Sequence, residues 1–265
     1  MSKLLDKLEK SQKDYGGKLG FNKNTNENIY PQILIVGKYS SYSFKSKESE
    51  QLVSLMDGIV FQSNLPNQVK DTLSSLPAHI TSLPWGVWPP SLKATDVTYL
   101  KKNNCDFIVS DIANTPLEAL HESTTARILQ IPNTLDERIL RSLDDLPVDG
   151  FLLQLSSKLA VKPLETLLEI TTLRSMVSKY LFVEFLTAPT EKYVDILKEV
   201  GIDVLIVDPT AVTSKQLTTL RTALIDLPKR VGRGSKSAAT VSQLCLLYTS
   251  PSPRDRTRSR MPSSA

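Results

Sequence analysis

The chain has 265 residues, 40% of them hydrophobic and 23% charged, which is enough to bury one large core. It has no uninterrupted apolar stretch of about 18 residues and no apolar run near Met1, so we expect neither a membrane span nor a signal peptide but a cytoplasmic protein. The formal charge of +4 gives no reason to expect a nucleic-acid partner, because four arginines and Asp255 near the end carry most of the excess and leave +1 without them.

The first expected element is a short charged helix over 2–13, with Leu4, Leu5 and Leu8 on one face, followed by a glycine- and asparagine-rich linker over 14–30. Short apolar, β-branched runs then alternate with helical patterns. The expected strands are 33–36, 58–61, 85–88, 107–109, 128–131, 151–155, 181–185 and 204–207. The expected helices are 48–56, 67–76, 95–103, 116–122, 136–146, 163–178, 190–200 and 214–227.

Apolar strands that alternate with helices indicate a parallel sheet covered by helices. Eight such units predict an α/β fold, the (βα)8 TIM barrel, over 31–230, preceded by the helix and linker of 1–30. An open doubly wound sheet is the competing fold, and it usually carries a glycine-rich turn after its first strand. Here that turn contains Gly37, Lys38 and Tyr39 and no glycine motif, which favours the barrel.

An aspartate precedes every second expected strand, as Asp57, Asp106, Asp149 and Asp203. A period of two units suits a barrel, because alternate strands supply alternate layers of side chains. An aspartate can accept backbone N–H bonds at a tight turn. We therefore interpret these four residues as structural, at the end of the barrel where the strands begin.

The active sites of TIM barrels lie where the strands end, a region called the mouth below. Glu184 stands in an otherwise apolar strand and needs a partner, and Lys38 is the expected one because strand eight alone separates strands one and seven. The predicted catalytic residues are Lys38 as clamp or Schiff-base nucleophile and Glu184 or Asp208 as general base. The other polar or aromatic strand ends are predicted to bind ligand: Gln62, Trp88, Asp111, Gln130 and Gln154.

Several alternatives stay open. Lys38 and Glu184 can form a purely structural ion pair, and polar strand ends can simply solvate the mouth. Trp88 can pack against the rim as a plug instead of stacking on a ligand. The chain is then either an enzyme acting on a small polar organic molecule or a barrel without catalysis that binds or assembles. In the second case the helix over 2–13 or the basic stretch 229–233 would contact a partner.

Few residues suit a metal or a nucleophile. Neither His79 nor His121 stands at a strand end, and they belong to different parts of the ring, so no histidine metal site is expected. Mg²⁺ on Asp111, Glu184 and Asp208 is the one metal alternative. Cys105 precedes a strand and is expected to be a small buried hydrophobe. We predict no cofactor, and the sequence does not predict an oligomeric state.

The stretch from Val194 to Asp208 resembles the last βαβ unit of phosphate-binding barrels such as indole-glycerol-phosphate synthase. That resemblance implies a phosphate site in the loops after strands seven and eight. Those families place glycines there so that backbone N–H groups can hold the phosphate. Here Pro189 and Pro209 remove donors and no glycine lies between Gly201 and Gly232, so phosphate binding is disfavoured, although the hydroxyls of Thr187, Thr210 and Thr213 are possible donors.

The end of the chain resembles translated sequencing adapter. One reading frame of a transposase-type library adapter encodes Cys245 to Asp255, and a second constant adapter segment encodes Ser259 to Ala265. We therefore interpret 245–265 as a non-native tail that packs against nothing, and 231–244 as the start of a truncated native segment, as in a metagenomic fragment. Without Cys245, Cys105 is the only thiol, which leaves no internal disulfide.

Overall fold

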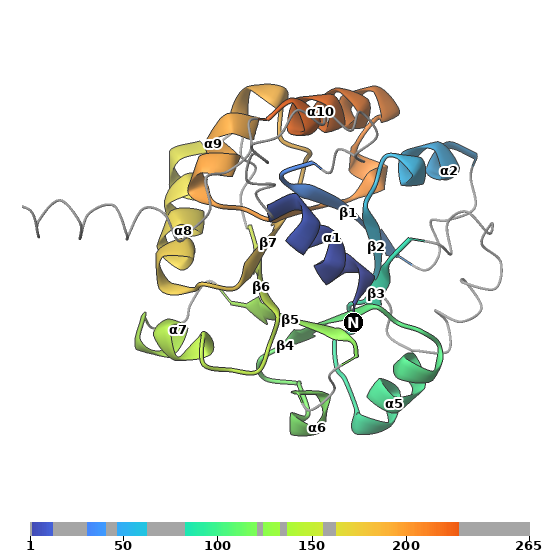
Figure 1. Ribbon diagram of the computed structural model, residues 1–265, viewed down its shortest axis with the longest axis vertical. Helices are drawn as coiled ribbons and strands as arrows, with labels where there is room; N and C mark the ends of the chain where they lie inside the picture. Colours follow the sequence, from blue (N-terminus) through green and yellow to red (C-terminus); the bar gives the residue numbers. More distant parts are fainter. Residues whose placement is uncertain are drawn as a thin grey trace, which may run out of the picture.

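The computed structural model describes residues 2–12, 31–40, 47–62, 83–120, 124–132, 137–155 and 163–227. Its strands are all parallel and form a closed barrel in chain order, with the last strand pairing with the first (Figure 1). They are β1 (Leu34–Ser40), β2 (Gly58–Gln62), β3 (Trp85–Val87), β4 (Phe107–Asp111), β5 (Ala126–Ile131), β6 (Gly150–Gln154), β7 (Tyr180–Phe185) and β8 (Val204–Val207). The predicted TIM barrel is thereby confirmed and the open sheet is excluded.

Helices surround this barrel, and one lies across its axis (Figure 1). They are α1 (Lys3–Gln12), α2 (Lys47–Ser54), α5 (Ala94–Lys102), α6 (Leu117–Leu120), α7 (Glu137–Leu143), α8 (Pro163–Met176), the 3-10 turn η1 (Glu191–Tyr193), α9 (Val194–Val200), the 3-10 turn η2 (Pro209–Ala211) and α10 (Ser214–Asp226). None of these described helices is long and apolar enough to cross a membrane. The helix expected over 67–76, the basic stretch 229–233, the segment 231–244 and the adapter-like tail 245–265 lie outside the described residues.

Three strands continue further toward the mouth than expected, β2 by the single residue Gln62. β1 extends through Lys38 to Ser40 and β4 extends to Asp111. The reason is strand pairing, because Ser40 lies opposite Gln62 in β2 and Asp111 lies opposite Gln130 in β5. Lys38 and Asp111 are therefore held by regular strand geometry.

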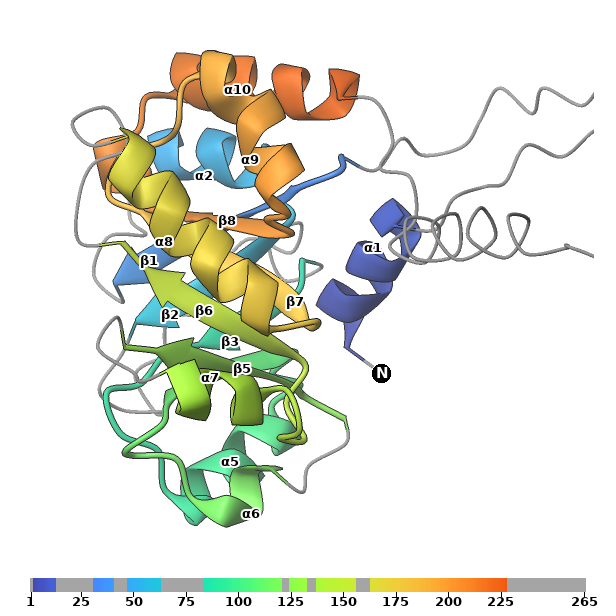
Figure 2. The same cartoon turned by 90° about the vertical axis from the view of Figure 1, so that its left-hand side faces the viewer.

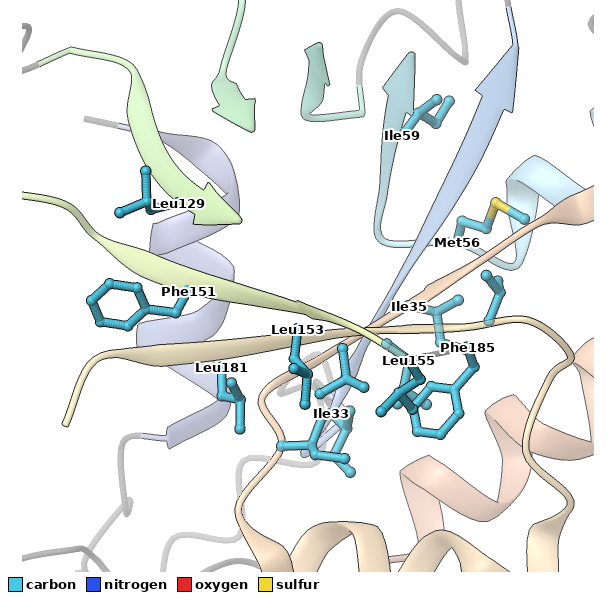
Figure 3. Close-up of a cluster of buried hydrophobic side chains, with 14 of the residues drawn as sticks. Ile33, Ile35, Met56, Ile59, Leu129, Phe151, Leu153, Leu155, Leu181 and Phe185 are labelled. Atoms are coloured by element: carbon cyan, nitrogen blue, oxygen red, sulfur yellow. The ribbon is translucent and has the colours of Figure 1, made fainter. Parts of the chain in front are cut away.

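The side chains of each strand alternate between two apolar regions. Outward residues such as Ile35, Leu153 and Leu181 pack between the strands and the helices (Figure 3). Inward residues fill the barrel, and because alternate strands supply alternate layers, the register places Val60, Val109, Leu152 and Ile206 at one level. Packed aliphatic side chains thus close the barrel below its mouth.

The helix α1 closes the opposite end. It lies at the end from which the strand arrows start (Figure 2), and Leu4 and Leu8 are fully buried in the inward cluster. Burial lowers the pKa of Lys7, whose ammonium donates to the carbonyl oxygen of Asp57 at 2.8 Å. The apolar face of α1 thus contacts the barrel itself, and a partner contact by this helix stays a prediction for its other faces.

The four aspartates lie at that same end, as predicted. Asp57, Asp149 and Asp203 each accept an N–H bond from the opposite residue of the preceding strand, namely Ile35, Arg127 and Leu181. Asp106 differs, because its carboxylate accepts the Ser2 hydroxyl and the amides of Lys3 and Leu4 at the start of α1. The aspartate before each even-numbered strand thus joins two strands at three places, and at the fourth it caps the helix α1.

We expect Asp203→Ala to lower the free energy of unfolding by about 3 kcal/mol. Asp203 is 1% exposed, accepts N–H bonds from Leu181 and Gln12 at 2.8 Å, and lies 3.6 Å from the guanidinium of Arg174. The substitution leaves these donors without their acceptor. Urea unfolding checks this, with Asp226→Ala on the exposed end of α10 as control; an equal effect of both would contradict a buried structural role.

Candidate functional site

The eight residues predicted at the strand ends all occupy inward positions, one from each strand. Each of them keeps the alternation of its strand, in which the preceding inward residue belongs to the interior cluster or is a glycine. The register divides them into two layers of four. The deeper layer, from the odd strands, is Lys38, Trp88, Gln130 and Glu184. The outer layer, from the even strands, is Gln62, Asp111, Gln154 and Asp208.

Lys38 and Glu184 form the centre of the deeper layer. The Lys38 Nζ atom lies 2.5 Å from Glu184 Oε1, with 16% and 8% of the two side chains exposed. The second oxygen, Glu184 Oε2, is buried and has no hydrogen-bond partner among the described residues. A buried polar atom left without a partner costs about 1–3 kcal/mol, so this oxygen needs an explanation beyond stability.

Trp88 lies beside this pair. The Lys38 ammonium is 4.8 Å from the centre of the indole ring, a cation–π distance. Trp88 is only 6% exposed and belongs to the interior cluster. Its ring therefore supports Lys38 from within the barrel, and little of it is free to stack on a ligand.

Two amides continue from the indole toward the rim. Trp88 Nε1 donates to Gln130 Oε1 at 3.1 Å, and Gln130 Nε2 donates to Gln154 Oε1 at 3.1 Å. Gln154 is exposed and lies opposite Glu184 in the pairing of β6 with β7. The deeper layer and Gln154 of the outer layer thus form one connected set of polar groups, from the ion pair to an exposed amide.

The two aspartates of the outer layer bind their own loops. Asp208 Oδ1 accepts the amide of Thr210 at 2.8 Å and its hydroxyl at 2.7 Å, which caps η2. Asp111 accepts the amide of Ala113 and the side-chain amide of Asn114, both at 3.2 Å. The structure thus brings Lys38 and Glu184 together but directs Asp208 to Thr210. Gln62 is exposed at the end of β2.

The region where phosphate-binding barrels hold phosphate is occupied by the chain's own groups. The amide and hydroxyl of Thr210 are taken by Asp208, and Thr213 caps α10 through reciprocal bonds with Gln216. Two of the three threonines that could have served a phosphate are therefore engaged locally. The order Asp208, Pro209, Thr210 could have predicted this cap, since aspartate before a first-turn proline is a typical helix start.

The other reactive groups of the described chain do not add to the mouth. Burial raises the pKa of the Cys105 thiol far above its ordinary value, which fits a buried small residue and not a nucleophile. Burial, with a smaller contribution from the charge of Asp208, also raises the pKa of the Tyr39 hydroxyl. No three His, Cys, Asp or Glu residues within the described ranges are grouped closely enough to hold a metal ion.

A cleft of about 430 Å³ lies at the other end of the barrel. Its lining includes Lys3, Trp85, Lys101, Cys105 and Asp106. This is where α1 begins, and the carboxylate of Asp106 is already satisfied by that helix. The cleft therefore borders the plug and is separate from the mouth.

Neither protein-family models nor curated proteins match the sequence. Solved structures do match in fold. Thiamine phosphate pyrophosphorylase from Pyrococcus furiosus is 9% identical with a TM-score of 0.53, over 74% of this chain and 98% of that chain. Orotidine 5'-phosphate decarboxylase from Pyrococcus horikoshii OT3 is 9% identical with a TM-score of 0.54, over 73% and 100%.

A third such structure is 3-hexulose-6-phosphate synthase from Salmonella typhimurium, 12% identical with a TM-score of 0.55, over 73% of this chain and 99% of that chain. Identities this low carry the fold and no activity. The chain is therefore similar to TIM-barrel enzymes in its fold.

Proposed function

We propose that this chain binds a small polar organic molecule at the mouth of the barrel, on the layer formed by Lys38, Trp88, Gln130 and Glu184. The observation that carries the proposal is the buried Glu184 carboxylate, which has one oxygen on Lys38 and the other without a hydrogen-bond partner in the described part of the chain. A buried ion pair is weak evidence for stability, because desolvation offsets its attraction. A ligand that binds to this pair would explain why the two charges are buried in the mouth.

Within this site Lys38 acts as an electrostatic clamp. Its ammonium is engaged by a carboxylate and by an indole face, two partners that attract a cation. A Schiff base would need the free amine, so the clamp is the better role of the two considered. Glu184 holds Lys38 in place and is the acid nearest to a ligand seated on it, with Trp88 and Gln130 as positioning residues.

Binding without catalysis is the second candidate, and a specific observation favours it. Asp111 and Asp208 are engaged by N–H groups of their own loops, and Glu184 is paired with Lys38. Each acid of the described mouth thus already has a partner within the protein. Asp208 becomes a general base only if it leaves Thr210.

A thermal-shift screen of small organic acids, carbonyl compounds and polyols tests the proposal. A ligand at about 100 times its Kd adds about 2.7 kcal/mol, which for a chain of this size raises Tm by about 5–10 °C. We expect Lys38→Ala and Glu184→Gln to abolish the shift while remaining folded by circular dichroism. The exposed residues Lys215 and Glu191 provide matched controls, Lys215→Ala and Glu191→Gln, which should retain it; a shift that survives both mouth variants would place the ligand elsewhere.

A further inference from the structure

The side-chain hydrogen bonds of the mouth run in one direction. An indole N–H can only donate, so Gln130 must turn its carbonyl oxygen toward Trp88. Its NH₂ group then donates to the carbonyl oxygen of Gln154. This order fixes the orientation of both amides, which leaves Gln154 with its NH₂ group as the exposed end of the chain of hydrogen bonds.

Gln154 occupies the strand position beside Glu184. Gln154 and Glu184 are direct partners in the register of β6 and β7, and neighbouring strands are about 4.8 Å apart. Glu184 takes one bond from the Lys38 ammonium, which can donate three. Glu184 thus has a charged donor, Lys38, on its carboxylate and a neutral donor, Gln154, on the neighbouring strand position.

Three of the four outer-layer side chains accept hydrogen bonds from within the protein, and the fourth, Gln62, is exposed. Asp111 and Asp208 accept from their own loops, and the carbonyl oxygen of Gln154 accepts from Gln130. The side of the mouth around Lys38 and Gln154 thus offers donors. A ligand that is complementary to it must supply two acceptor atoms, and also a donor for Glu184 Oε2, the oxygen without a partner among the described residues.

Charge decides between the acceptor groups. A carboxylate has two oxygens, one for each donor, and a single negative charge that Lys38 can attract. Glu184, Asp111 and Asp208 repel any anion, so the two charges of a phosphate dianion are disfavoured more than the single charge of a carboxylate; the amide and hydroxyl of Thr210 are already bound to Asp208. We propose that the ligand of the site described above is a small monocarboxylate, held by Lys38 Nζ and Gln154 Nε2; this inference rests on the proposed function.

The experiment compares acetate, glycolate and pyruvate with acetamide, glycerol and inorganic phosphate at constant ionic strength. Binding is followed by titration calorimetry and by the side-chain amide signal of Gln154 in ¹H–¹⁵N spectra, assigned by its loss in Gln154→Glu. We expect carboxylate binding to weaken at least tenfold in Gln154→Glu, which replaces the donor by a like charge. Gln51→Glu on the exposed face of α2 makes the same charge change away from the mouth and should alter binding less than twofold.

The outcomes separate the two proposals. Binding of glycerol, acetamide or phosphate that is lost in Lys38→Ala, without carboxylate binding, overturns the monocarboxylate but keeps the proposed function. Equal losses in Gln154→Glu and Gln51→Glu overturn the role of Gln154. Carboxylate binding that persists in Lys38→Ala, or no binding of any of the six probes, overturns the inference.

Discussion

Lys38→Met should destabilise the barrel by about 3 kcal/mol, and adding Glu184→Met should restore most of that loss. The single substitution leaves the Glu184 carboxylate, 8% exposed, without its cation. Removing both charges removes the desolvation cost of the pair, and methionine keeps the volume of each side chain nearly constant. Urea unfolding of the wild type, the two single variants and the double variant gives the coupling free energy between the two side chains.

A second pair provides the matched control for this cycle. Arg127 and Asp149 lie 3.2 Å apart at the opposite end of the barrel, with 21% and 26% of their side chains exposed. Better solvated pairs contribute about 1 kcal/mol or less, so their coupling should be clearly smaller. A Lys38→Met cost no larger than that of Arg127→Met would mean that the mouth pair is well solvated.

The cycle also separates a structural from a functional pair. If the pair serves stability alone, the double variant should regain stability and still bind any ligand that the wild type binds. If it serves a ligand, the double variant should be as stable as the wild type and still fail to bind. A stable double variant that still binds would contradict the clamp role of Lys38.

The sequence predicts the strand order well because each strand is a short apolar run bounded by turn residues. It also predicts the Lys38–Glu184 contact, since a carboxylate within an apolar strand needs a cation and β1 and β7 are near neighbours in a closed barrel. The contact of Lys38 with Trp88 was missed. Alternate strands share a layer, so the odd strands could have been read together to place Lys38, Trp88, Gln130 and Glu184 at one level.

Other features depend on tertiary contacts that no local pattern contains. Leu4, Leu5 and Leu8 predict an amphipathic helix, but only the assembled barrel determines what their face covers. Asp106 occupies the same sequence position before a strand as the other three aspartates. It nevertheless caps α1, because that helix begins beside it. The sequence thus indicates which residues need partners, and the topology determines which partners they find.

Leu8→Ala should lower the free energy of unfolding by about 3 kcal/mol, and Leu4→Ala by a similar amount. Both side chains are 0% exposed and belong to the same buried cluster as Leu34 and Phe107, so each substitution leaves a cavity between α1 and the barrel. Urea unfolding followed by circular dichroism measures the loss. Leu164→Ala on α8, where the side chain is 70% exposed, is the control and should change stability by less than about 0.5 kcal/mol.

Asp106→Ala extends this test to the start of α1. It removes the acceptor of the Ser2 hydroxyl and of the Lys3 and Leu4 amides, so it should destabilise the helix without touching the apolar contacts. If α1 is part of the folded core, Asp106→Ala and Leu8→Ala should each lower the midpoint of one cooperative transition. If Leu8→Ala costs no more than Leu164→Ala, the helix does not close the barrel in solution, and its apolar face becomes available to a partner after all.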